Sequence, residues 1–145
     1  MPLNSFVATA TTCDIAPGSE QVTRQGLLQI RGRTFTDVVE SSDPSVAGTN
    51  RPTLDLDLDP ARGDGQLRGR FVLSPSTPGG AWEGEMSGRF EAGFVRAAGL
   101  ARGTGRLSGA VLQVEFRQIA KHPGAAPCAD PKAFFEMSGT ILTPD

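Results

Sequence analysis

The chain has 145 residues, 38% of them hydrophobic, and a formal net charge of −2. This length suits one domain with a buried core, and the nearly balanced charge gives no electrostatic reason to expect nucleic acid as a partner. No run approaches the ~18 apolar residues that a membrane-spanning helix needs, so we expect no membrane partner. The 18 glycines and 11 prolines separate short alternating runs, which predicts a single all-β domain over residues 1–145.

The N-terminal residues and the two cysteines bear on the compartment of the protein. Residues 1–5 lack the basic and apolar regions of a signal peptide, which favours a cytoplasmic protein as given. A mature secreted domain with an added Met1 would look the same. Cys13 and Cys128 either form a disulfide in an oxidising compartment or remain two separate thiols. Together with His122, the only histidine, they are too few for a zinc site, so we expect no metal.

The first third of the chain predicts two strands and a long loop. Residues 5–12 alternate weakly and form a first strand, and residues 14–25 read as a loop. Residues 26–36 form the next strand, which Gly32 interrupts with a bulge. Residues 35–40 continue that strand.

Residues 53–59 give the clearest period-2 pattern in the sequence. Three leucines alternate there with three aspartates: Leu54, Asp55, Leu56, Asp57, Leu58 and Asp59. Carboxylates on one side of a strand repeat every ~7 Å, which is compatible with a cation site or an acid pair. The plainer interpretation is a solvated strand face above a leucine core face, and we expect buried leucines and exposed aspartates.

The rest of the chain predicts a series of hairpins. Strands are expected at residues 66–74, 81–90, 91–100, 110–119 and 133–142, and residues 121–132 form a proline-rich loop over one end of the barrel. In residues 81–90, Trp82, Met86 and Phe90 share a face with two glycines. This alternation of large side chains and glycines is a pattern that leaves room for a ligand inside a barrel.

Residues 103–109 contain three glycines in seven residues and lead directly into the strand expected at residues 110–119. The run resembles the late barrel strands of allene oxide cyclases and, more loosely, dirigent proteins and spiro-tetronate cyclases. The matching positions are Gly103, Gly105, Gly109, Ala110, Gln113, Val114, Gln118 and Ile119. The resemblance implies a single antiparallel β-barrel of about eight strands.

The resemblance also implies a function. Allene oxide cyclases hold a hydrophobic epoxide in an apolar barrel and use few polar residues, tyrosine among them. This chain has no tyrosine, so none of that family's functional residues is carried over. We expect a cofactor-free cyclase or isomerase for a hydrophobic small molecule, promoted by the shape of the cavity.

Catalytic candidates are Glu115, Glu85 and His122; His122 would have to point into the barrel mouth, and its alternative is an exposed loop residue. Glu115 lies on the strand that resembles the family, but only one face of that strand can line the interior, and hydrophobicity favours the face of Leu112, Val114 and Phe116. The expected ligand-binding residues are Phe71, Trp82, Met86, Phe90, Phe116, Phe135 and Met137. The alternatives are a lipocalin-like barrel that binds a hydrophobic ligand without catalysis, and a barrel packed solid. Related barrels often associate, so a homo-oligomer is compatible with this fold.

Overall fold

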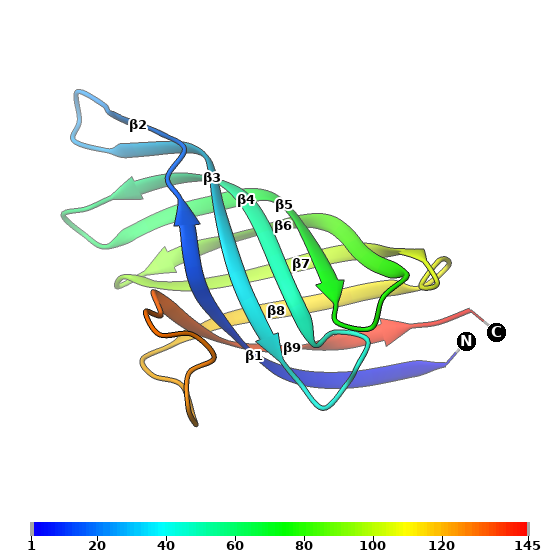
Figure 1. Ribbon diagram of the computed structural model, residues 1–145. Coiled ribbons are helices and arrows are strands. Elements are labelled where there is room, and N and C mark those ends of the chain that lie inside the picture. Colours follow the sequence, from blue (N-terminus) through cyan, green and yellow to red (C-terminus); the bar gives the residue numbers. More distant parts are fainter. Residues whose placement is uncertain (1, 145) are drawn as a thin grey trace.

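The computed structural model describes residues 2–144 and shows an antiparallel barrel closed by eight strands, with one further strand outside the ring (Figure 1). The strands are β1 (Leu3–Ala16), β2 (Ser19–Val22), β3 (Leu28–Glu40), β4 (Gly48–Asp59), β5 (Asp64–Pro75), β6 (Gly80–Glu91), β7 (Phe94–Gly105), β8 (Val111–Ile119) and β9 (Ala133–Leu142). The predicted all-β barrel is confirmed. Over the described part of the chain, no helix is long and apolar enough to span a membrane.

Closure of the barrel depends on β1, which pairs with β9 on one side and with β3 on the other. β2 pairs with β3 alone, so the β2–β3 hairpin projects beyond the ring (Figure 1). The loop expected at residues 14–25 is therefore wrong. After a register shift between Thr12 and Asp14, β1 continues beside β3 to Ala16, and those ladder hydrogen bonds keep the segment extended.

The predicted bulge at Gly32 is confirmed. The β3–β4 register shifts between Ile30 and Arg33, and Gly32 has a φ of +67°, in the left-handed region that favours glycine. Asp55 Oδ1 accepts a hydrogen bond from the Gly32 amide at 3.0 Å. This aspartate therefore holds the bulge in place.

The leucine and aspartate faces of β4 are as expected. Leu54 and Leu56 are buried in the core, while Leu58, near the strand end, is half-buried. Asp57 lies on the outer face between Arg31 and Arg68, at 2.9 and 3.3 Å. Hydrogen bonding from Arg31 is the main reason that the pKa of Asp57 is lowered from its usual value. These carboxylates are partly exposed and satisfied by the protein.

One end of the barrel is plugged by Trp82. Its side chain is completely buried, and its indole Nε1 donates a 2.8 Å hydrogen bond to the carbonyl oxygen of Ser45 in the β3–β4 loop. Val46, in the same loop, is also completely buried. The indole donor is thus satisfied in an otherwise apolar core, which fixes the loop over this end.

The glycines of β6 have a different role from the expected one. A Cβ atom at Gly84 would lie 2.0 Å from the backbone oxygen of Leu100, and one at Gly88 would lie 2.1 Å from that of Arg96. These glycines allow β6 and β7 to approach closely, because any side chain would collide with the neighbouring backbone. The interpretation that they make room for a ligand is wrong.

Candidate functional site

The barrel interior contains a cavity of about 210 Å³, displaced from the Trp82 plug towards the opposite end. It extends from Leu54 and Met86 in the core to Gly93 in the β6–β7 turn and Lys132 before β9. Its walls are mostly apolar and come from every barrel strand. They include Phe35, Leu54, Leu56, Leu67, Met86, Phe90, Phe116 and Phe135.

Three polar side chains form one row across the cavity wall. Thr12, Asp37 and Asn50 occupy directly paired positions on β1, β3 and β4. Thr12 Oγ1 donates to Asp37 Oδ1 at 2.7 Å, and Asn50 Nδ2 donates to Asp37 Oδ2 over a longer 3.5 Å. All three are buried, with Asp37 only 5% exposed. The row places one carboxyl group in an otherwise apolar cavity.

Burial has a large effect on the protonation of Asp37. Desolvation raises the pKa of its carboxyl group from 3.8 to about 6, while the hydrogen bonds from Thr12 and Asn50 act in the opposite direction. A carboxyl group with a pKa near neutrality can both accept and return a proton under ordinary conditions. Strongly shifted groups inside cavities are candidates for functional residues.

The amide of Asn50 leaves an acceptor without a donor. Its Nδ2 faces Asp37, because the reverse orientation would place two oxygen atoms against each other. Its Oδ1 accepts no hydrogen bond from the residues that the structure describes. A buried oxygen without a donor costs free energy, so the site favours a ligand group that donates a hydrogen bond.

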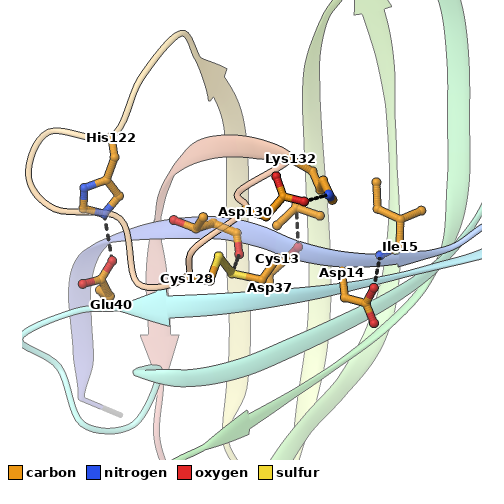
Figure 2. The surroundings of a disulfide bond; sticks show 11 residues. Cys13, Asp14, Ile15, Asp37, Glu40, His122, Cys128, Asp130 and Lys132 are labelled. Atoms are coloured by element: carbon orange, nitrogen blue, oxygen red, sulfur yellow. Dashed lines mark hydrogen bonds and ion pairs between the residues drawn. A yellow bond between two sulfur atoms is a disulfide. The ribbon is translucent and has the colours of Figure 1, made fainter.

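The loop at residues 120–132 is fixed to the barrel next to this row. A disulfide joins Cys13, the neighbour of Thr12 on β1, to Cys128 in the loop (Figure 2). The sequence left the pairing of these cysteines open, and the structure shows the bond. The Lys132 amide donates to the Thr12 carbonyl oxygen at 2.8 Å, so the loop returns to the cavity mouth at Lys132.

The three predicted catalytic residues lie away from the cavity. Glu85 and Glu115 are exposed on the outer faces of β6 and β8. The structure places them in two separate outer depressions. Neither Glu85 nor Glu115 is among the residues that line the cavity that contains Asp37. Their catalytic role stays a prediction.

His122 also lies outside the barrel, although it is nearly buried. Its Nε2 is 2.8 Å from Glu40 Oε1 (Figure 2). Its Nδ1 accepts a hydrogen bond from the Gly124 amide at 2.9 Å. Its ring packs edge-on against Phe134. These contacts hold the loop against the outer wall, and His122 does not line the cavity, as a role as general base there would require.

The predicted ligand-binding residues divide into two groups. Met86, Phe90, Phe116 and Phe135 line the cavity. Phe71, Trp82 and Met137 belong to the packed core, where Phe71 meets Phe116 edge-on with ring centroids 6.3 Å apart. The aromatic walls were thus predicted in part, while the polar row was missed.

A sequence signal for the missed carboxyl group does exist. Phe35, Asp37 and Val39 share one face of a predicted strand, so an aspartate stands where the pattern requires a core residue. No comparable signal marks Asn50. Pro52 argues against a strand at this point of the sequence, although β4 already begins at Gly48.

Comparison with known proteins found no matching family model, no matching curated protein and no matching solved structure. Within residues 2–144, no group of three or more histidine, cysteine, aspartate or glutamate side chains could hold a metal ion.

Proposed function

We propose that the barrel is a cofactor-independent isomerase or cyclase that holds a small, mostly apolar molecule in its cavity, with Asp37 as the group that transfers a proton. One observation carries the proposal: a single buried carboxyl group, with a pKa raised to about 6, lies in an apolar cavity of about 210 Å³. Ligand sites usually combine apolar walls with a few polar groups that orient the ligand. The resemblance of residues 103–119 to allene oxide cyclases supports the same reaction class.

The geometry supports a division of roles. The phenylalanine and leucine walls would restrict the conformations of a flexible substrate, which favours ring closure or rearrangement. Asp37 would accept a proton on one side of the substrate and return it to another atom, as isomerisation requires. Thr12 would orient the carboxyl group and stabilise its ionised form. Such a reaction needs no oxidant or reductant.

A non-catalytic binding barrel is the second candidate. It is favoured by the small cavity and by the unpartnered Asn50 Oδ1, since both features serve recognition without requiring chemistry. The two candidates share the cavity and differ only in whether Asp37 moves a proton.

A test substrate that loses a proton from carbon distinguishes the isomerase or cyclase from the non-catalytic binding barrel. 5-Nitrobenzisoxazole loses its ring C–H proton to a base while the N–O bond breaks; the C–H electron pair forms a nitrile, and the oxygen leaves as a coloured phenolate. We expect the protein to accelerate this reaction and Asp37→Asn to slow it by about 100-fold or more. A rate that Asp37→Asn does not change would overturn the role of Asp37 in proton transfer.

Matched variants locate the reaction within the protein. Ala133 pairs with Thr12 and lines the cavity, so Ala133→Phe should fill part of the cavity and abolish turnover. Ala98→Phe places the same ring on the outer face of β7 and should leave turnover unchanged. Glu85→Gln and Glu115→Gln test the earlier catalytic candidates, and loss of turnover in either variant would move the site to the outer surface.

A further inference from the structure

The Asp37 carboxyl group is buried without a cation beside it. It accepts hydrogen bonds from Thr12 and Asn50, and among the described residues no lysine, arginine or histidine forms an ion pair with it. Lys132 is the other charged side chain that lines the cavity, but it lies at the mouth and pairs with Asp130 at 2.5 Å. Buried charges in proteins are usually paired, so the ionised form of Asp37 favours a cationic partner.

The hydrogen-bond acceptors around Asp37 also favour a cationic ligand, because two of their oxygen atoms lack a good donor. Asp37 Oδ2 receives only the long 3.5 Å bond from Asn50, and Asn50 Oδ1 receives none. Both residues line the cavity, so a ligand group with several donors would supply what the two oxygens lack. A protonated amine supplies up to three such donors and a positive charge, whereas a hydroxyl group supplies one donor and no charge.

The walls of the cavity complement such a ligand. Phe35, Phe90, Phe116 and Phe135 surround the space with aromatic rings, which attract cations through their faces and pack against an apolar body. A cavity of about 210 Å³ is smaller than the range of about 300–1,000 Å³ typical of drug-sized ligands. The ligand is therefore small.

We infer that the cavity takes a small protonated amine with an apolar body, its ammonium group bound by Asp37 and by Asn50 Oδ1 and its body enclosed by the phenylalanine walls. The inference rests on the proposed function, because it takes this cavity as the ligand site, and it adds the chemical class of the ligand. Bound in this way, the ammonium group neutralises Asp37 and satisfies the unpartnered oxygen of Asn50.

Three probes of similar shape test the inference on the full, disulfide-bonded chain: phenethylamine, 2-phenylethanol and phenylacetate. Near pH 8, Asp37 is ionised, since its pKa is about 6. Calorimetry should then give phenethylamine a dissociation constant at least about tenfold lower than that of 2-phenylethanol, because charge-assisted hydrogen bonds exceed neutral ones. Well below pH 6 the preference should disappear.

Two variants that each remove one negative charge show which carboxyl group causes the preference for the amine. Asp37→Asn should remove the preference for phenethylamine over 2-phenylethanol. Glu83→Gln removes a negative charge from the exposed outer face of β6 and should keep the preference. If Glu83→Gln weakens amine binding as much as Asp37→Asn, general attraction explains the preference and the inference fails.

The failures of the inference and of the proposed function are distinguishable. Equal binding of phenethylamine and 2-phenylethanol, blocked by Ala133→Phe, would overturn the amine class while the cavity remained a ligand site. Tightest binding of phenylacetate would also overturn it, and would point to Lys132 as the recognition group. If none of the probes binds and 5-nitrobenzisoxazole is not turned over, both the inference and the proposed function fail.

Discussion

Thr12 Oγ1 donates a 2.7 Å hydrogen bond to Asp37 Oδ1 across the strand pair that closes the barrel. The bond links the first and third strands in the wall of the cavity, and it occupies one oxygen of the carboxyl group. The second oxygen faces only the distant Asn50 amide. The same contact therefore supports barrel closure and leaves Asp37 able to bind or protonate a ligand.

The buried carboxyl group should make stability depend on pH. The pKa of Asp37 is about 6 in the folded protein and 3.8 as its ordinary value, so the folded protein binds this proton more tightly than the unfolded chain does. Rising pH therefore destabilises the protein between about pH 4 and pH 6. The free energy of unfolding falls by about 3 kcal/mol in all, and nearly all of this decrease has occurred once the pH is above 6.

The comparison with Asp37→Asn isolates this contribution. We expect the free energy of unfolding of the variant, minus that of the wild type, to increase by about 2 kcal/mol from pH 4 to pH 7. Urea denaturation at several pH values measures this difference, and the other carboxylates cancel because both proteins contain them. A difference that stays constant or decreases with pH would contradict the raised pKa.

The Thr12 hydroxyl group should lower the pKa of Asp37, because its hydrogen bond stabilises the ionised carboxylate. Thr12→Val keeps the shape of the side chain and removes the donor, so we expect the pKa of Asp37 to rise above its wild-type value. Thr12→Ser keeps a hydroxyl group and should give a value close to the wild type. Carbon-13 NMR titration of the Asp37 carboxyl group measures both; an unchanged value in Thr12→Val would show that the bond does not act on the carboxylate.

Truncation of Phe116 should destabilise the protein more than loss of an outer carboxylate. Phe116 is buried against Phe71 and lines the cavity, so Phe116→Ala should cost about 3–5 kcal/mol. Asp57→Ala removes two partly exposed ion pairs with Arg31 and Arg68 and should cost less than about 1 kcal/mol. Thermal or urea unfolding gives both values, and the reverse order would mean that the strand faces are wrongly assigned.

The disulfide should contribute strongly to stability, because it closes a loop between residues 115 positions apart. Replacing Cys13 and Cys128 with serine should cost about 2–5 kcal/mol. It should also increase hydrogen exchange in residues 120–132. The matched control is Glu40→Gln, which weakens the His122 contact to the same loop and should have a much smaller effect. If the two changes were equal, the disulfide would not be the main attachment of the loop.

The strand faces could be predicted from the sequence because they depend on local alternation. Leu54 and Leu56 are buried as expected, and Gly32 forms the expected bulge, since a glycine between alternating residues is a local signal. The extent of the strands was harder to predict. β4 begins at Gly48 and includes Pro52, a residue that argues against a strand interior when only sequence is considered.

The site could not be assembled from local patterns. Thr12, Asp37 and Asn50 become neighbours only through pairings between strands distant in sequence, and the register of β1 also shifts after Thr12. Alternation identifies Asp37 as an inward-facing residue, but it does not show which residues face it. Glu115 was a catalytic candidate because it lies on the strand that resembles the family, although the alternation favoured the opposite face as the inner one; the structure places both Glu115 and Glu85 on the outside.

The pairing of β1 with β9 has a consequence for how the chain folds during synthesis. From β3 to β9 each strand pairs with its neighbour in sequence, so these hairpins can form soon after they are made. β1 lacks one partner until β9, which ends at Leu142, has been synthesised. Until then β1 and β9 cannot complete the ring. The enclosed cavity is therefore a property of the finished chain, and we expect a chain ended before Ala133 to expose strand edges and aggregate.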